Sequence, residues 1–484
     1  VEIPLQALFE SQTLASLAAV IEKARTGETA GEQKRKVERI ERQERSEGMP
    51  LSFHEQGVYV MARHAPAYRS LASQMTIRLQ GKLNLGALER SLQEIVERHE
   101  ILRTRYGMKN GREVRILDPA WKVCATPTEI GGVEREEQVR QAVIQEQTKP
   151  FDLEQGPLLR INLLKLGEQE HVLLVTTHHI ITDGWSMSIL SRELQTLYAG
   201  YVTGRRVCLP ALKIQYADYA VWQRDRLRGE VFDRLLGYWM KRLGAVKTSA
   251  RLRGDRLPGL SPSLREEQIA FVIGKEVTER IRVLSRKQGV TPFIILLAIF
   301  KLWLYQNTAA RDIAVVVPVS ERNLFELEDV VGLLINMVVL HTQVGEDLNF
   351  EEFLRQLHEV RQKAFAHQAL PFGIVHQALG NADFSRVMFD YINVPDYELK
   401  LTGLKADPLR YRGNSSSSWD VILVLREKSE SIDCLLTFDA DLFSRERAVE
   451  LSEQLKNLIV QVLQAPQKRL SQYSQTPLYD CAQI

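Results

Sequence analysis

Two adjacent histidines, His178 and His179, precede Asp183 and Gly184 in the run HHIITDGWS at residues 178–186. These residue types could form an amide from an activated acyl group. An amine attacks only as the neutral base, and a free α-amine has a pKa of about 8 whereas an imidazole has one of about 6.5. A histidine can therefore take or hold the proton that the amine loses. Asp183 could fix the loop through a buried ion pair, and Gly184 leaves room for a substrate to approach the backbone.

Two other interpretations of the histidine pair stay open on the segment alone. A zinc site is disfavoured because His178 and His179 are adjacent, so on an extended backbone their side chains point to opposite faces. The zinc-protease pattern instead places two histidines at i and i+4 on a helix. The second alternative is a pair of core histidines satisfied by local hydrogen bonds.

Composition limits the class of protein. A chain of 484 residues predicts two or three domains. Lys and Arg (63) nearly balance Asp and Glu (61), so the net charge of +2 gives no reason to expect nucleic acid or an anionic membrane as partner. The apolar run 291–304 is interrupted by Lys301 and falls short of the ~20 residues that span a bilayer. The four cysteines lack CxxC spacing. We therefore expect a cytoplasmic, reduced protein.

Hydrophobic periodicity predicts the elements that position the histidines. Residues 73–80 alternate as a strand does, and residues 85–99 place their apolar side chains along one helical face. Residues 171–177 form a β-rich apolar run that ends at the histidines, and a helix is expected from 186 to about 201. The histidine pair should therefore lie where a strand runs into a loop.

The second half of the chain repeats this mixture. A helical period covers residues 275–307 and 350–369, strands are predicted at 312–320 and 336–344, and a long helix at 443–464. Residues 419–426 and 431–438 resemble a β-hairpin with a polar turn at 427–430. Strands and helices alternate in both halves, so we predict a mixed α/β (α+β) fold with two lobes of similar size.

The histidine segment resembles the HHxxxDG signature of the condensation domains of nonribosomal peptide synthetases. The wider chloramphenicol acetyltransferase-like superfamily shares the shorter HxxxDG. Four further runs are similar to condensation motifs and follow in the family's order: RHEILRT at 98–104, YADYAVW at 216–222, VGLLIN at 331–336 and HQALPF at 367–372. On these motifs the chain is identified as a member. The resemblance implies two lobes in a V-shaped pseudodimer, with a central tunnel and His179 at its middle.

Two motifs depart from the family pattern. The first, SFHEQGVY at 52–59, keeps its serine but lacks the usual arginine. The seventh is shortened to DFSR at 383–386 and is followed directly by VMF at 387–389. These changes leave the histidine chemistry intact and bear on local packing, acceptor contacts and substrate class.

The resemblance assigns roles to the central residues. His179 is the catalytic histidine, acting as a general base or positioning the amine, and His178 holds the loop by hydrogen bonds. Asp183 matches the family aspartate that pairs with an arginine from the other half of the chain. Arg322, in PVSERN at 318–323, occupies the matching position.

Three further residues are possible substrate neighbours. Trp185 and Ser186 line the loop, and Ser186 could simply cap the following helix. Asn336 either makes a hydrogen bond near the reaction centre or holds a strand end. The motifs at 98–104 and 216–222 are expected to be architectural.

The resemblance also implies the domains and partners. Residues 1–26 are similar to the C-terminal part of a peptidyl carrier protein whose phosphopantetheine-bearing serine would lie upstream. A charged linker at 27–48, an N-terminal lobe at 49–225 and a C-terminal lobe at 226–484 would follow. The chain itself would bind neither a metal nor a cofactor. Substrates would arrive on the phosphopantetheine arms of an upstream donor carrier and a downstream acceptor carrier, or the acceptor would be a free amine. Neighbouring synthetase domains would be partners.

Two alternative functions remain. An epimerisation domain shares the histidine signature but removes a proton from the α-carbon, and the motif at 98–104 favours condensation instead. A non-catalytic docking module would recruit a tailoring enzyme. Such relatives usually have a degraded signature, whereas His179, Asp183 and Gly184 are all present here.

Overall fold

The computed structural model describes residues 18, 19, 22, 39–64, 66–244, 246, 251–256, 265–308, 310–345, 347–380, 386–392, 399–409 and 419–473. The chain divides into two compact units, residues 1–40 and 41–484. In the first unit Ala18, Ala19 and Glu22 are helical and exposed. The rest of the expected carrier fragment, the linker up to residue 38 and residues 383–385 of the shortened seventh motif lie outside the described residues.

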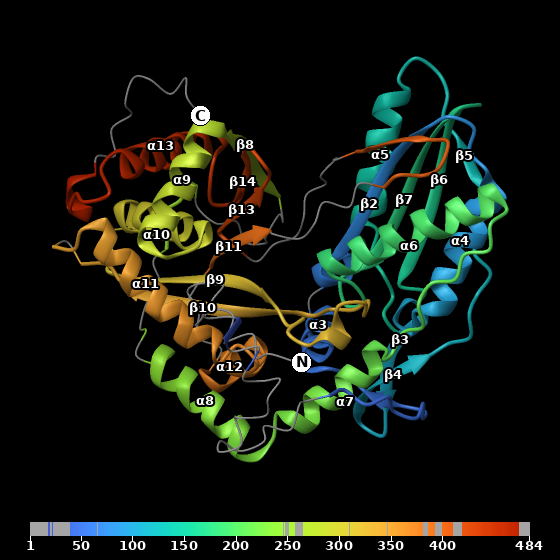
Figure 1. Ribbon diagram of the computed structural model, residues 1–484, viewed down its shortest axis with the longest axis horizontal. Helices are drawn as coiled ribbons and strands as arrows, with labels where there is room; N and C mark the ends of the chain where they lie inside the picture. Colours follow the sequence, from blue (N-terminus) through green and yellow to red (C-terminus); the bar gives the residue numbers. More distant parts are fainter. Residues whose placement is uncertain are drawn as a thin grey trace. The chain divides into compact units, whose positions relative to one another are not determined.

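The first large sheet of the second unit carries the histidine pair. Its strands lie in the order β12(Lys405–Pro408), β2(Ala72–Gln80), β7(Glu170–His178), β6(Leu159–Gly167) and β5(Pro127–Glu129). Strands β2 and β7 are antiparallel, with Ala72 opposite His178. Val139 and Val143 of α5(Arg135–Thr148) pack on one face, against a cluster that includes Val172 and Leu174. Figure 1 shows α4(Leu85–Arg98) and α6(Gly184–Thr203) on the other side of the sheet.

Smaller elements complete this half. A three-stranded sheet has the order β1(Met49–Pro50), β4(Arg112–Leu117) and β3(Thr104–Lys109). The helices beside it are α3(Phe53–His64) and α7(Tyr216–Arg226), and short 3₁₀ turns lie at Pro66–Ser70 and Glu100–Arg103.

The second large sheet has six strands. Their order is β10(Ile335–Gln343), β9(Asp312–Ser320), β11(Val387–Ile392), β13(Val421–Glu427), β14(Ile432–Asp439) and β8(Glu266–Ile273). Strand β11 is parallel to both of its neighbours, and the other pairs are antiparallel. The remaining helices are α8(Gly229–Leu243), α9(Lys275–Gln288), α10(Pro292–Thr308), α11(Phe350–Phe365), α12(Phe372–Ala378) and α13(Arg445–Gln464), with 3₁₀ turns at Phe325–Leu327 and Leu470–Gln472.

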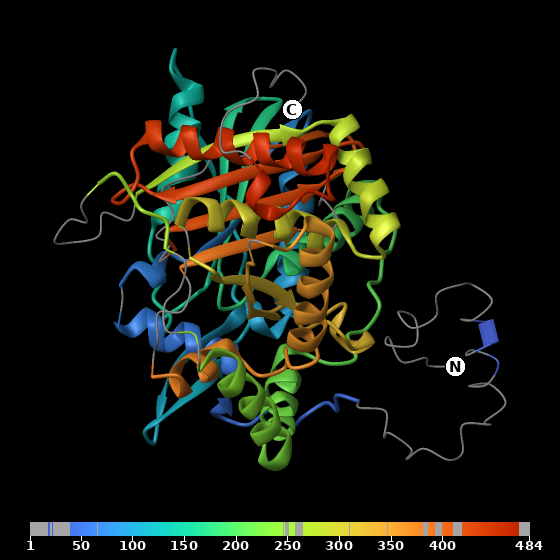
Figure 2. The same ribbon diagram turned by 90° about the vertical axis from the view of Figure 1, so that its left-hand side faces the viewer.

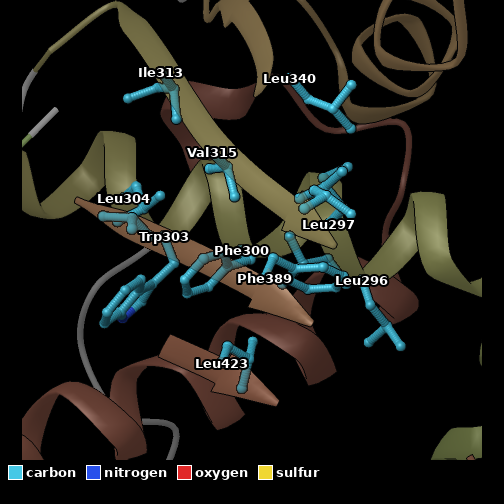
Figure 3. Packing of buried hydrophobic residues seen from close by; sticks show 14 of the residues in the cluster. Leu296, Leu297, Phe300, Trp303, Leu304, Ile313, Val315, Leu340, Phe389 and Leu423 are labelled. Carbon is cyan, nitrogen blue, oxygen red and sulfur yellow. The ribbon is translucent and has the colours of Figure 1, made fainter. Parts of the chain in front are cut away.

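Helices cover one face of the second sheet, as Figures 1 and 2 show for α9, α10, α11 and α13. Helix α10 is apolar all round and therefore buried, because every one of its faces needs an apolar neighbour. Figure 3 shows Phe300 and Trp303 of α10 packed near Phe389 and Val315 of the sheet. Lys301 lies inside this core, where its ammonium donates hydrogen bonds to the carbonyls of Ile313 and Leu340 at 2.8 and 2.6 Å.

In the described part of the chain, no single helix combines the length and apolar character needed to cross a membrane. Helices α9 and α10 pass that test of length and composition only as a pair, and they are bent by 104°.

The mixed α/β class is confirmed, as are the strands predicted around 73–80, 171–177, 312–320 and 336–344. The region 275–307, predicted with one continuous helical period, forms two helices, α9 and α10. The first ends because Gly289 adopts a left-handed φ of 64°. The helix predicted at 350–369 ends at Phe365. Strand β12 joins the first sheet although it follows the predicted lobe boundary at residue 225. The V shape, the tunnel and the lobe boundaries stay predictions.

Candidate active site

The histidine segment joins β7 to α6. His178 is the last residue of β7, and α6 begins at Gly184 with Asp183 as its N-cap. The Asp183 carboxylate accepts a hydrogen bond of 2.7 Å from the Ser186 backbone N–H, which satisfies a free donor of the first helical turn. The helix expected from 186 to about 201 is present but begins earlier, at Gly184, because Asp183 is its cap and Ser186, the alternative cap, lies inside the helix.

His178 is a structural residue by its contacts. Its Nε2 lies 2.9 Å from the Tyr68 carbonyl, and its Nδ1 accepts a hydrogen bond of 3.0 Å from the Ile180 backbone N–H. These partners assign the proton to Nε2. Burial lowers the pKa of His178 to about 4, and the nearby His179 adds to this effect. A neutral histidine with both nitrogens engaged has no free nitrogen for a substrate or a metal.

His179 has the opposite surroundings. Its backbone N–H donates to the Leu71 carbonyl at 2.7 Å, which fixes the main chain beside β2. Neither ring nitrogen of His179 has a hydrogen-bond partner in the part of the chain that the structure describes, and Nδ1 is buried. A polar nitrogen held without a partner is uncommon and calls for an explanation. The imidazole of His179 is available to an incoming group, which the imidazole of His178 is not.

The Asp183 carboxylate is fully used. It is 1% exposed. Besides the Ser186 N–H it accepts hydrogen bonds from the Ser186 hydroxyl at 2.6 Å and from the Leu334 N–H at 3.1 Å. Arg322 Nη2 reaches its two oxygens at 3.0 and 3.1 Å. The ion pair expected from the sequence is present, and a carboxylate with these partners positions the loop and cannot also accept a substrate proton.

Arg322 joins the two halves of the chain. Its Nη1 donates to the carbonyls of Leu327 and Val330 at 2.7 and 2.6 Å, while Nη2 faces Asp183. Burial lowers the pKa of the Arg322 guanidinium, and the charge of Asp183 opposes this effect. Arg322 therefore holds the 321–334 loop of the second half against the first turn of α6.

The residues around Asp183 strengthen this junction. The Ser186 hydroxyl is buried and lies 3.0 Å from both the N–H and the carbonyl of Gly332. The Trp185 indole N–H donates to the Glu328 carbonyl at 2.9 Å. Gly184 is exposed, and a methyl group at its Cα would meet no atom within 4 Å. Through these contacts Ser186 and Trp185 hold the loop in place, whereas the position of Gly184 borders open space.

Asn336 holds a strand end. Its amide nitrogen donates to the carbonyls of Gln368 and Leu370 at 2.6 and 2.9 Å, and its amide oxygen accepts from the N–H groups of Met337 and Phe372 at 2.8 and 3.0 Å. Of its two expected roles, these contacts favour the structural one.

The contacts of the motifs at 98–104 and 216–222 favour the architectural role expected of them. Arg98 and His99 both bind the Glu193 carboxylate of α6, at 3.0 and 2.8 Å, so the end of α4 is tied to the helix that follows the histidines. The Tyr216 hydroxyl of α7 lies 2.7 Å from the Leu333 carbonyl and 3.0 Å from Ser52 Oγ. It links the first motif, at 52–59, with the motifs at 216–222 and 331–336 in one buried contact.

Sequence reasoning missed a second buried charge pair. Glu55, in the first motif, accepts hydrogen bonds from Arg115 at 2.5 and 2.6 Å and from the Tyr106 hydroxyl at 2.7 Å. Glu55 and Arg115 are both buried. The sequence signal for this pair was a charged residue, Glu55, within the first motif. Its partner could not be predicted, because no sequence spacing relates Glu55 to an arginine on β4.

A neighbouring cluster gathers at Glu321, the residue before Arg322. The hydroxyl of Tyr219 and the amide of Gln223, both on α7, donate to Glu321, and His54 Nε2 lies 3.0 Å from the same carboxylate. Tyr219, Gln223 and Glu321 line a pocket together with Trp222 and Arg226.

Comparison with known proteins places this arrangement in a family. The family model described as "Condensation domain" matches residues 45–484. The chain is 33% identical over 472 residues to a linear gramicidin synthase protein of Brevibacillus parabrevis, with 96% of this chain and 6% of that protein aligned. It is 32% identical over 480 residues to a dimodular nonribosomal peptide synthase of Bacillus subtilis (strain 168), with 95% and 20% of the two chains aligned. The chain thus spans about a fifth or less of these relatives.

Solved structures share the fold. The X-domain in its complex with OxyB from teicoplanin biosynthesis has a TM-score of 0.82 at 24% identity, covering 92% of this chain and 99% of that chain. The first condensation domain of the calcium-dependent antibiotic synthetase, in complex with a substrate analogue, has a TM-score of 0.75 at 19% identity, covering 89% and 100% of the two chains. With the family model matched along nearly the whole chain, these findings lead to one conclusion: the chain belongs to the condensation-domain family.

Proposed function

We propose that this chain forms an amide bond by attack of an acceptor amine on a carrier-bound aminoacyl or peptidyl thioester. The observation that carries the proposal is the contrast between the two histidines. His178 is neutral and engaged at both ring nitrogens, whereas the ring of His179 has no hydrogen-bond partner among the described residues. The loop that presents His179 is held by the Asp183–Arg322 pair.

The proposed reaction needs one proton acceptor near the amine. The amine nitrogen attacks the thioester carbon, the C–N bond forms, and the C–S bond breaks to release a thiol. His179 takes the proton from the amine, or holds the amine in its neutral form, and a proton returns to the leaving sulfur. Asp183 and His178 keep the loop in place while this occurs, and neither exchanges a proton with the substrate.

The substrates would arrive on phosphopantetheine arms. The donor would come from an upstream carrier and the acceptor from a downstream carrier, or the acceptor would be a free amine. We place His179 within a tunnel between two lobes, entered by the arms from opposite faces. Tethering replaces diffusion with a high local concentration, so a site without strong substrate contacts could still work at a useful rate. A cytoplasmic location is part of the same proposal.

A second candidate is a docking module for another protein, because the fold is shared with an X-domain solved in complex with OxyB. The free imidazole of His179 argues against it, since a module that only docks needs no unpartnered ring nitrogen at the end of a buried strand. Epimerisation, the third possibility, would produce deuterium exchange at the donor α-carbon with no amide.

The experiment offers the protein an aminoacyl donor on one carrier and either a second loaded carrier or free amines, and measures amide by mass spectrometry. His179→Ala should lower the rate about 10²- to 10⁴-fold. His358→Ala, on α11, is the matched control and should leave the rate unchanged. Undiminished amide formation by His179→Ala would remove the proposal, and tight binding of a third protein without amide formation would favour the docking module.

A further inference from the structure

The second sheet presents two unlike faces. Figure 3 shows Phe389 of β11 among the core side chains next to α10. Because side chains alternate along a strand, Met388, Asp390 and Ile392 point to the opposite face, away from these helices. All three are half-buried, as are Ile422 and Val424 on the neighbouring β13. This second face is thus partly open and apolar next to Asp390, and it also carries Arg426 of β13 and Asp433 of β14.

Asp390 makes no direct ion pair with the described residues, and the charge that acts on it is that of Arg426, level with Ile392 on the same face. Its position is level with Val424 on β13, and its neighbours along β11 on the same face are Met388 and Ile392. In the described part of the chain Asp390 makes neither a hydrogen bond nor an ion pair. Burial raises the pKa of Asp390 to about 6, although the Arg426 guanidinium acts in the opposite direction. A desolvated carboxylate without a partner is costly, and such groups concentrate where a ligand supplies the missing partner.

The topology brings Asp390 to the edge of the sheet that meets the histidine loop. Strand β11 is parallel to β9, with Met388 opposite Val316, so Asp390 is level with Pro318. Parallel strands end at the same edge of their sheet. From Pro318 the chain leaves β9 at Ser320 and reaches Arg322, which binds Asp183. Asp390 therefore lies on the strand beside the one that leads to the interlobe ion pair.

We propose that Asp390 determines substrate specificity by binding a cationic nitrogen, an ammonium or a guanidinium, on the side chain of one of the two condensing acyl groups. The proposal rests on the proposed amide-forming function. An ionised carboxylate makes strong charge-assisted hydrogen bonds with such cations, and the apolar side chains around Asp390 suit the methylene stem that carries them. A bound cation also favours the charged carboxylate, so the substrate supplies what the protein does not.

The test compares cationic substrates with neutral substrates of similar shape. Carriers are loaded with lysyl or norleucyl groups, and with arginyl or citrullyl groups, first at the donor position with a neutral acceptor and then at the acceptor position with a neutral donor. At one of the two positions we expect kcat/KM to be about 10- to 100-fold higher for the cationic member. Asp390→Asn should abolish that preference and leave the neutral substrates unaffected.

Asp433→Asn is the matched control. Asp433 lies opposite Arg426 on the adjacent β14, on the same face, and its charge is already paired with Lys428 at 2.7 Å. This control should keep the wild-type preference. Thermal unfolding of Asp390→Asn should show no loss of stability, because the change removes a half-buried charge that makes no ion pair with the described residues.

Three outcomes would overturn the inference. Equal loss of cationic and neutral substrates in Asp390→Asn would make the residue structural. Absence of a cationic preference in the wild-type protein at both positions, with amide still formed, would reject the specificity and leave the proposed function standing. If the wild-type protein formed no amide from any pair, the proposed function would fail and the inference with it.

Discussion

Arg322 Nη2 lies 3.0 and 3.1 Å from the two carboxylate oxygens of Asp183, across an interface between the 321–334 loop and the first turn of α6. Both side chains are almost fully buried, 4% and 1% exposed. Removing either member would leave the other as an uncompensated charge. This ion pair thus connects the two halves of the chain, and we expect the stability of the histidine loop to depend on it.

Asp183→Ala should therefore destabilise the protein by about 3–5 kcal/mol in addition to slowing the reaction. Chemical denaturation measures this change. Combined with Arg322→Ala, the loss should be clearly smaller than the sum of the two single losses, because the partners share one interaction. The matched control is Arg192–Asp329, a pair at 2.7 Å that joins the same helix and loop but is 63% exposed on both sides. Breaking it should cost less than about 1 kcal/mol. An equal loss of unfolding free energy for the two pairs would contradict the structural role of Asp183–Arg322.

The lowered pKa of His178 leads us to expect that the stability of the protein depends on pH. Its folded pKa of about 4 lies below the ordinary value of 6.5, so between these values the unfolded chain binds more protons than the folded one. This contribution to stability is complete above pH 6.5 and is lost as the pH falls towards 4. It is on the order of 3 kcal/mol, since one pKa unit corresponds to about 1.4 kcal/mol.

The measurement compares wild-type protein with His178→Gln, which has no titrating ring. Unfolding free energies from pH 7.5 to 4.5 should show the variant less stable at neutral pH, because it loses the Tyr68 and Ile180 hydrogen bonds. The gap should narrow on acidification. A gap that stays constant or widens towards low pH would show that His178 is not buried as a neutral ring.

Much of the fold was predictable because periodic apolar patterns are local. The alternating run at 73–80 and the apolar run before His178 each fix a strand, and their observed counterparts are β2 and β7. The short β5 and β12 were not predictable, since three or four residues carry too little pattern. The break at Gly289 was missed because the apolar periodicity continues on both sides of it, in α9 and in α10. Only the left-handed conformation of this one glycine ends the first helix.

Only those site residues that belong to a family motif could be predicted from the sequence. The Asp183–Arg322 pair followed from family resemblance and could not be derived from spacing, because the two residues meet only through the tertiary fold. The contacts of Ser186 with Gly332, and of Glu55 with Arg115, depend on the same long-range packing. Asp390 gave no sequence signal beyond a charged residue in a short apolar strand, and only the sheet register shows which face it occupies.

Gly184 and Gly332 make a matched pair of substitutions. A Cβ at Gly184 would meet no atom of the protein within 4 Å, whereas one at Gly332 would lie 1.8 Å from the Tyr216 ring. Gly184→Ala should keep or slightly raise stability, by up to about 1 kcal/mol in a helical first turn. Gly332→Ala should destabilise by about 1–3 kcal/mol or more through overpacking.

Activity separates the two glycines further. If the open space at Gly184 receives substrate, kcat/KM for amide formation in Gly184→Ala should fall about 10- to 100-fold while the thermal stability stays the same or rises slightly. Full activity in Gly184→Ala would show that the glycine does not border the reacting groups, and a folded, stable Gly332→Ala would contradict the observed packing against Tyr216.

Asn336→Asp tests whether this residue contacts substrate or holds a strand end. The substitution keeps the shape but replaces the amide NH₂ with an oxygen that would face the carbonyls of Gln368 and Leu370. Two acceptors would lose their donor and a carboxylate would be buried beside them, so we expect a loss of about 2–5 kcal/mol in chemical denaturation. For the folded fraction, kcat and KM should stay close to wild type, because the amide has no hydrogen-bonding group left for a substrate. A stable variant with a specific fall in kcat would instead place Asn336 at the reaction centre.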